Sequence, residues 1–388
     1  MSIQTERMIS VIFFDKEIKK LGFGMMRLPK EDDVIDIEQV KVMVDHFMEA
    51  GFTYFDTAWA YDGSEAAIRQ ALVERYPRES FQLATKNAAW INCKTREDAI
   101  RQFEESLERT GAGYFDNYLL HNLGESRTHF FDDFNMWDFV AQKKAEGKIR
   151  HYGFSFHSTP EELDAILTAH PDAEFVQLQI NYADWENPAI QSRGVYEVAR
   201  KHGKPVIIME PLKGGLLADP PKEVKEVLQS ADAEKSAASW GIRFAADLDG
   251  VLVVLSGMSS VEQMDDNLSF MHDFSGLSDD QRAVVDEARA ALARIPLIPC
   301  TNCNYCAKVC PKEIGISGTF TAMNMHTLYQ NMQFAKRQEK WLVGGHGRNH
   351  AIECIKCGAC ETVCPQHIPI RDTLSRGAEL FEQVKEQQ

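Results

Sequence analysis

The sequence predicts a (β/α)8 barrel followed by a small, mostly helical domain. Short apolar runs alternate with amphipathic stretches eight times over roughly 250 residues, a pattern that suits a closed barrel better than an open sheet. After the last alternation, Pro296 and Pro299 interrupt the helical pattern. Beyond them a cysteine-rich motif occurs twice. These observations separate a large α/β domain from a distinct tail.

The expected strands and helices follow one another in order along the first domain. The stretch DIEQVKVMVDHFMEAG reads as a helix that ends at Gly51. In STPEELDAILTAH, Thr159 is the expected cap, Pro160 takes the first helical position and Glu162 completes a capping box. The expected strands read LGFGMM, FTYFD, FQLATK, YFDNYLLH, HYGFSF, FVQLQIN, PVIIME and VLVVLSG.

The domain boundary follows a last capped helix. LSDDQRAVVDEARAALARIP begins with a capping box of Ser278 and Gln281 and ends at the prolines. We therefore expect the barrel over residues 1–275, a helical linker over 276–299 and the tail domain over 300–388.

Charge and hydropathy exclude several classes of protein. The chain of 388 residues carries 42 Lys and Arg against 58 Asp and Glu, a net charge of −16. Such a surface repels nucleic acid and anionic lipid. No apolar run reaches the roughly 20 residues of a membrane span, and MSIQTERMIS lacks the features of a secretory signal. We expect a cytoplasmic protein with neither nucleic acid nor membrane as a partner.

Eight of the nine cysteines lie in two copies of one motif, CTNCNYCAKVCP and CIKCGACETVCP, offset by 54 residues from Cys300 to Cys354. C-x2-C-x2-C-x3-C-P is the two-cluster [4Fe–4S] pattern, in which the fourth cysteine of each copy binds the other cluster. Zinc does not need the third closely spaced cysteine. The remaining cysteine, Cys93, stands alone and is assigned no role. The expected ligands are Cys300, Cys303, Cys306 and Cys364 for one cluster and Cys354, Cys357, Cys360 and Cys310 for the other.

The tail is therefore expected to be a ferredoxin-like domain. The segment between the motifs, GTFTAMNMHTLYQNMQFAKRQEKWLV, has helical character, so we expect a mostly helical domain rather than the compact β-hairpin type. Motif spacing leaves open whether the clusters conduct electrons or only stabilise the domain.

Four polar residues lie where barrel strands end, the position at which barrel enzymes place their chemistry. Reduction of a carbonyl requires a hydride at carbon and a proton at oxygen. Tyr61 could donate that proton if a cation stabilises its phenolate. Lys86 would supply the charge, and Asp56 would pair with Lys86 and hold it. His121 would bond the carbonyl oxygen and orient it.

The sequence resembles the aldo-keto reductases through GFTYFDTAWAYDGSE, LATK and YLLHN, in that order, over roughly residues 20–270. With NYADWENP, EPLKGG and CTNCNYCAKVCP added, it is similar to the bacterial aldo-keto reductases fused to a C-terminal two-[4Fe–4S] ferredoxin-like domain. The resemblance implies an oxidoreductase that interconverts a carbonyl and an alcohol with NADH or NADPH. A redox partner protein is a further expectation for the clusters.

The resemblance also implies a nucleotide site, which departs from the family pattern. Phe156 stands where asparagine is usual and Met209 where an aromatic residue often stacks on the nicotinamide. Gly257 and Gln263 replace the lysine and arginine of NADP-binding members, and Lys213 is the candidate replacement cation. The choice between NAD and NADP stays open. The implied cofactor-binding residues are Ser155, Gln177, Pro211, Leu212, Gly214, Ser256, Gly257, Gln263, Asp266 and Asn267.

Two other functions remain open at this stage. A nicotinamide gives up two electrons as a hydride, a cluster passes one at a time, and no feature of the sequence argues for a flavin to join them. The clusters could instead feed single electrons to a substrate in the barrel without nicotinamide turnover, with Tyr61 as proton donor. Alternatively, the protein could be a non-catalytic sensor of oxygen or redox state. Trp59, Trp90 and Trp185 could line a substrate pocket or pack in the core, and their strand-end loops favour a pocket role for the first two.

Overall fold

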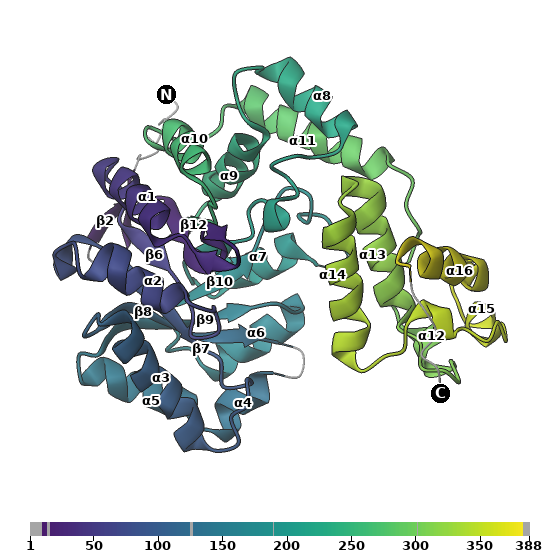
Figure 1. Ribbon diagram of the computed structural model, residues 1–388, viewed down its shortest axis with the longest axis horizontal. Coiled ribbons are helices and arrows are strands. Elements are labelled where there is room, and N and C mark those ends of the chain that lie inside the picture. The colour runs from purple at the N-terminus through teal and green to yellow at the C-terminus, as the bar shows by residue number, and fades with distance from the viewer. Residues whose placement is uncertain (1–9, 14–15, 125–126, 189, 301, 383–388) are drawn as a thin grey trace. The chain divides into compact units, whose positions relative to one another are not determined.

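The computed structural model of the protein shows two compact units (Figure 1). One comprises residues 1–218 and 232–285, and the other residues 219–231 and 286–388. The boundary between them falls inside helix α11 (Asp279–Arg294), the helix that the sequence predicts for the linker. Ser278 and Gln281 form the expected capping box at its start. The structure describes residues 10–13, 16–124, 127–188, 190–300 and 302–382.

The first unit confirms the predicted barrel. Among the described residues, eight parallel strands close in the order β10-β11-β12-β3-β6-β7-β8-β9, which places each sequence-adjacent pair side by side. All eight predicted runs form strands. Their bounds are Leu21–Gly24 (β3), Tyr54–Asp56 (β6), Gln82–Asn87 (β7), Phe115–Leu123 (β8), Ile149–Phe156 (β9), Phe175–Gln179 (β10), Val206–Met209 (β11) and Val251–Ser256 (β12).

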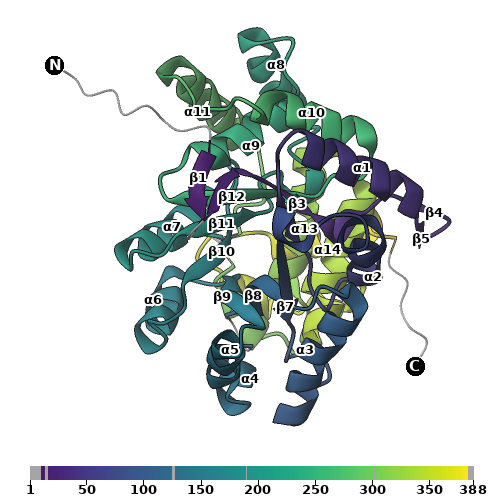
Figure 2. The same cartoon turned by 90° about the vertical axis from the view of Figure 1, so that its left-hand side faces the viewer.

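Helices surround these strands (Figure 2). Side chains cap the starts of some of these helices: at α6, the Thr159 hydroxyl accepts a hydrogen bond from the Glu162 amide, as the sequence predicts for a cap. The helices of this unit are Ile37–Glu49 (α1), Ser64–Ile68 (α2), Arg96–Thr110 (α3), Thr128–Asp133 (α4), Met136–Ala145 (α5), Pro160–Ala169 (α6), Ser192–Lys201 (α7), Ala237–Asp247 (α9) and Val261–Met271 (α10).

Two short hairpins were not predicted from the sequence. β1 (Ser10–Phe13) pairs with β2 (Lys16–Lys19), and β4 (Lys30–Glu31) pairs with β5 (Val34–Ile35). Each strand is only two to four residues long, and Lys16–Lys19 and Lys30–Glu31 carry charged residues in place of the apolar runs that mark the barrel strands. Ile18 of β2 is buried in the apolar cluster that includes the inward-facing residues of the barrel strands.

The barrel has an inner and an outer apolar layer. Phe47, Phe55 and Phe103 belong to the outer layer, between strands and helices. The inner layer consists of every second side chain along the strands, because successive residues of a strand point to opposite faces. It includes Tyr54, Ala84, Leu119, Phe175, Ile207, Val253 and Leu255.

The second unit is mostly helical, as predicted. Its helices from residue 305 onward contribute to a separate apolar core that includes Ile316, Phe320 and Ile370, and a parallel bridge joins Ile314 to Asn349. The helices are Lys222–Ala231 (α8), Tyr305–Lys308 (α12), Ile316–Tyr329 (α13), Met332–Leu342 (α14), Ala359–Thr362 (α15) and Ile370–Leu380 (α16). Of the described helices in either unit, none is both long and apolar enough to cross a bilayer.

Candidate functional site

A buried ion pair lies at the carboxyl ends of β6 and β7. The Lys86 ammonium donates to Asp56 Oδ1 at 2.5 Å and to the Thr57 carbonyl at 2.7 Å. Lys86 is fully buried and Asp56 is 3% exposed. Lys86 lies two residues after Ala84, and Asp56 lies two residues after Tyr54, both of the inner layer. Because side chains alternate along a strand, the pair points inward in the next layer of the barrel.

Charge in this pair favours the ammonium form of the lysine. Burial alone lowers the pKa of Lys86, but Asp56 and Tyr61 act against burial and the pKa is raised above its usual value. Burial raises the pKa of Asp56, and the Lys86 charge opposes that rise. Because an unpaired buried charge is costly, each residue keeps the other ionised.

Tyr61 lies in the loop after β6, beside this pair. The Lys86 ammonium is 5.2 Å from the centre of the Tyr61 ring. Burial raises the pKa of Tyr61, whereas the Lys86 charge lowers it. The tyrosine therefore holds its proton at neutral pH, and the cation beside it is placed to stabilise a phenolate.

His121 completes the group from β8. Its ring meets that of Tyr61 edge to face, with centres 5.7 Å apart. Burial and the nearby Lys86 charge hold the pKa of His121 well below its usual value, so the ring is neutral. Its Nδ1 atom is buried with no hydrogen-bond partner among the described residues. A buried N–H without an acceptor is rare, so the proton belongs on Nε2, where it can be donated to a carbonyl oxygen.

The loop that carries Tyr61 is held at both ends. The Thr57 and Ser64 hydroxyls are 2.7 Å apart, and Ser64 also donates to the Met25 carbonyl. Between them, the Trp59 indole N–H donates to Glu105 of α3 at 2.7 Å. Trp59 therefore anchors the loop to a helix, a role that sequence spacing does not show.

Trp90 and Trp185, the other two tryptophans considered for a substrate pocket, differ in their surroundings. The Trp90 N–H donates to the His121 carbonyl at 3.0 Å, and the two rings lie 6.2 Å apart, so Trp90 is part of the site. Trp185 packs against Tyr196 and Phe244 instead.

The side chains implied for the nicotinamide end have unused hydrogen-bonding capacity. Gln177 Oε1 and Asn122 Oδ1 are buried and, among the described residues, lack partners. The Ser155 hydroxyl accepts from the Asn122 backbone N–H at 2.7 Å, which leaves its own hydrogen to be donated. A carboxamide needs one acceptor for its NH2 group and one donor for its oxygen. These residues fit a nicotinamide, although Asn122 was not predicted.

At the opposite end, the implied nucleotide residues bond within the protein. Asn267 donates to the Ser256 hydroxyl at 2.7 Å. Asp266 accepts from Ser236 at 2.7 Å, and Gln263 accepts from the amide of Ser259 at 2.8 Å. The remaining implied residues follow β11 or β12: Pro211, Leu212, Gly214 and Gly257.

The expected replacement cation is already paired. Lys213 bonds both carboxylate oxygens of buried Asp184, at 2.6 and 2.7 Å. Arg27, which was not predicted from the sequence, lies beside the loop after β12. Its Cβ is 3.8 Å from the position that a Cβ would take at Gly257, and the residue is exposed.

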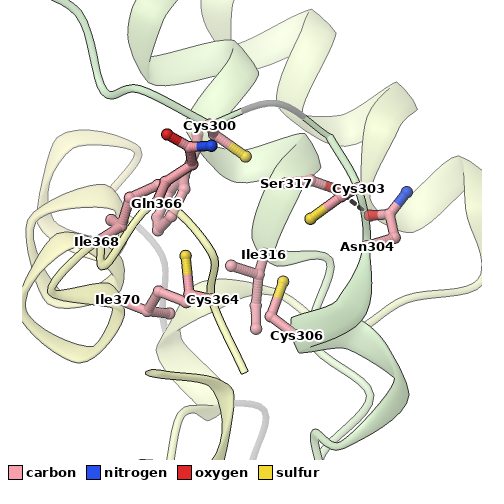
Figure 3. Close-up of a pocket in the computed structure, with 11 residues that line it drawn as sticks. Cys300, Cys303, Asn304, Cys306, Ile316, Ser317, Cys364, Gln366, Ile368 and Ile370 are labelled. Atoms are coloured by element: carbon pink, nitrogen blue, oxygen red, sulfur yellow. Dashed lines mark hydrogen bonds between the residues drawn. The ribbon is translucent and has the colours of Figure 1, made fainter. Parts of the chain in front are cut away.

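In the second unit, the cysteines surround two cavities. Cys300, Cys303, Cys306 and Cys364 line the first (Figure 3). Cys310, Cys354, Cys357 and Cys360 line the second. Each cavity therefore takes three cysteines from one motif and the last cysteine of the other.

The walls of both cavities suit a sulfur-ligated group. Four thiols and apolar side chains such as Ile316, Ile368 and Leu374 surround the space. Burial raises the pKa values of Cys306 and Cys360 to about 11, so iron must displace their protons on binding. Within the described residues, no three His, Cys, Asp or Glu side chains are grouped so that they could hold a single metal ion.

Comparison with protein families gives two matches in chain order. Residues 20–290 match the aldo/keto reductase family, and residues 299–368 match the 4Fe-4S dicluster domain.

Individual proteins show the same similarity over the barrel. An aldo-keto reductase of Mycolicibacterium vanbaalenii is 32% identical over 62% of this chain and 79% of its own length. The methylglyoxal reductase DkgB of Salmonella typhi is 30% identical over 48% of this chain and 64% of its own length.

Solved structures agree on the fold. The aldo-keto reductase AKR11C1 of Bacillus halodurans has a TM-score of 0.56 at 22% identity, covering 71% of this chain and 93% of its own. A Klebsiella pneumoniae aldo-keto reductase in complex with NADPH has the same TM-score and identity, covering 70% and 90%.

Proposed function

The chain belongs to the aldo/keto reductase family and carries a C-terminal 4Fe-4S dicluster domain, and from this premise we propose that it reduces a carbonyl to an alcohol with a nicotinamide cofactor. The nicotinamide would supply the hydride. Tyr61 would donate the proton, Lys86 and Asp56 would stabilise the tyrosine after its loss, and neutral His121 would bind and orient the carbonyl oxygen.

The observation that carries this proposal is the buried Lys86–Asp56 pair beside Tyr61. A tyrosine with a pKa near 10 is a weak acid at neutral pH, and a fixed cation next to it favours proton loss during the reaction. The unpartnered oxygen of Gln177 supports a carboxamide-bearing cofactor over a substrate fed by single electrons alone.

For the tail we propose two [4Fe–4S] clusters, one held by each set of cavity cysteines. Their ligands would be Cys300, Cys303, Cys306 and Cys364 for the first cluster and Cys310, Cys354, Cys357 and Cys360 for the second. We further propose that they exchange single electrons with a redox partner protein.

Replacement of Tyr61 by Phe tests the proposal. The variant keeps the ring against His121 and removes only the acidic hydroxyl. We expect nucleotide binding to be retained and reduction of small aldehydes such as methylglyoxal to fall by about 10²- to 10⁴-fold. Tyr305→Phe, which changes an exposed tyrosine of the other unit, is the matched control. Full reductase activity in Tyr61→Phe would rule out catalysis by this group.

A further inference from the structure

The two cysteine cavities are built from equivalent positions of the internal repeat. Apart from Ile316, every residue that lines the first cavity has its partner, 54 positions away, on the wall of the second. Ile368 corresponds to Ile314, and Phe320 corresponds to Leu374. Because the same positions form both walls, the cavities can be compared residue by residue.

Several properties that set a cluster's reduction potential are matched between the cavities. Cys306 and Cys360 are 9% and 7% exposed, and Cys303 and Cys357 are both exposed. In each motif a backbone N–H two residues after the first cysteine reaches that cysteine: Lys356 N lies 3.4 Å from Cys354 Sγ, and the Asn302 amide acts in the same way on Cys300. Solvent exposure and these N–H···S contacts therefore do not distinguish the two sites.

Charge does distinguish them. The first cavity is lined by Gln366 and Ser317, and Ser317 donates to Asn304 at 2.5 Å (Figure 3). At the equivalent positions the second cavity has Lys312 and Arg371. Two neutral polar side chains in one wall are thus replaced by two cations in the other.

The two cations do not contribute equally. Arg371 forms an ion pair with Glu361 at 2.8 Å, which offsets much of its charge. No ion pair involves Lys312 in the part of the chain that the structure describes, and Lys312 is partly buried. Of the two cations in this wall, Lys312 is therefore the one whose charge no ion-paired carboxylate of the described residues offsets.

We propose that these residues make the two clusters inequivalent, so that the cluster of Cys310, Cys354, Cys357 and Cys360 has the higher reduction potential. This inference rests on the proposed ligand sets. Each cluster takes up one electron from a one-electron donor and gains one negative charge. A cation in the wall stabilises the reduced form more than the oxidised form, and net charge is one of the determinants of cluster potential. An electron entering the domain therefore settles first on the second cluster.

A redox titration followed by electron paramagnetic resonance tests this on the cluster-replete full chain, with dithionite as the electron donor. We expect two one-electron waves. Lys312→Gln should lower the reduction potential of the upper wave and leave that of the lower wave in place. The ratio in which an electron divides between the two clusters should change about tenfold, which corresponds to about 59 mV. Lys340→Gln, which removes an exposed cation of α14 that lines neither cavity, should move neither wave.

The reciprocal variant tests the same inference without removing a native charge. Gln366→Lys should raise the lower wave by a similar amount. Iron content, measured for every protein, separates loss of a cluster from a change in potential and so distinguishes failure of the ligand sets from failure of this inference. Coincident waves in the unmodified protein would overturn the proposal, as would a lower wave that moves in Lys312→Gln or stays fixed in Gln366→Lys.

Discussion

Lys86 Nζ lies 2.5 Å from Asp56 Oδ1, and both residues are shielded from solvent. The two side chains come from neighbouring barrel strands and form an ion pair whose ammonium group lies next to Tyr61. Under the proposed function, this arrangement would let Tyr61 act as an acid without exposing Lys86 to water, and the predictions below depend on it.

Removal of the lysine should affect activity and stability together. Lys86→Met takes away the cation that stabilises the phenolate, so carbonyl reduction should fall by about 10²- to 10⁴-fold. It also leaves Asp56 buried without its partner, which should lower the free energy of unfolding by about 3–5 kcal/mol. Chemical denaturation and steady-state kinetics measure the two effects.

The double variant Asp56→Asn, Lys86→Met provides the control for Lys86→Met. It removes both charges, so it should recover part of the lost stability while remaining inactive. Normal turnover in either variant would contradict the assigned roles.

The pH dependence should reflect Tyr61 and not His121. Since Tyr61 must carry its proton to donate it, and burial raises its pKa above 10, kcat/KM for reduction should stay level through neutral pH and fall only at alkaline pH. His121 is already neutral, so no change should occur near pH 6.5. A rate profile from about pH 5 to about pH 11.5 measures this.

Asp56→Asn should alter that profile in a defined direction. Without the carboxylate, burial lowers the pKa of Lys86, and the lysine loses its charge at a lower pH. The alkaline fall in activity should move to lower pH. An unchanged alkaline limb, or an inflection near 6.5 that disappears in His121→Gln, would be inconsistent with this electrostatic account.

The interleaving of the cysteines predicts a specific pattern of iron loss. Cys303→Ser and Cys364→Ser remove ligands from the same cavity, so each should lose about half of the iron, and the double variant should lose no more. Cys303→Ser combined with Cys310→Ser affects both cavities and should lose nearly all. Iron analysis and visible absorbance give the result. Equal iron content in the two double variants would contradict the ligand sets.

Arg27 should contribute to nucleotide choice. Arg27 lies next to Gly257, and Gly257 is in the loop where the family pattern expects phosphate-binding cations. The other candidate cation, Lys213, is paired with Asp184. Since a charge-assisted hydrogen bond contributes about 1.5–3 kcal/mol, Arg27→Gln should weaken NADPH binding about 10- to 100-fold and leave NADH binding nearly unchanged. Arg101→Gln, an exposed arginine on α3, serves as the control in calorimetry. Equal effects on both nucleotides would exclude contact with the 2′-phosphate.

Much of this site could be predicted because it depends on local rules. Strand alternation and strand ends locate Asp56, Lys86 and His121, and the repeated cysteine spacing predicts which cysteines share a cavity. The pairing of Lys213 with Asp184 could not be predicted, since it joins loops that are adjacent only in the folded barrel. The same holds for Trp59 with Glu105 and for Arg27 beside Gly257. The unequal charge of the two cavities is present in the sequence, but only the structure shows that Lys312 and Gln366 line them.

The proposed function places hydride transfer from nicotinamide to a carbonyl in the barrel. The most direct test mixes cluster-replete protein anaerobically with NADH or NADPH, with no other electron source, and follows nicotinamide and cluster absorbance before and after methylglyoxal is added. We predict that one nucleotide binds, that it is oxidised only once the aldehyde is present, and that the cluster absorbance does not change. Failure of both nucleotides to bind, or bleaching of the clusters without the aldehyde, would contradict the account.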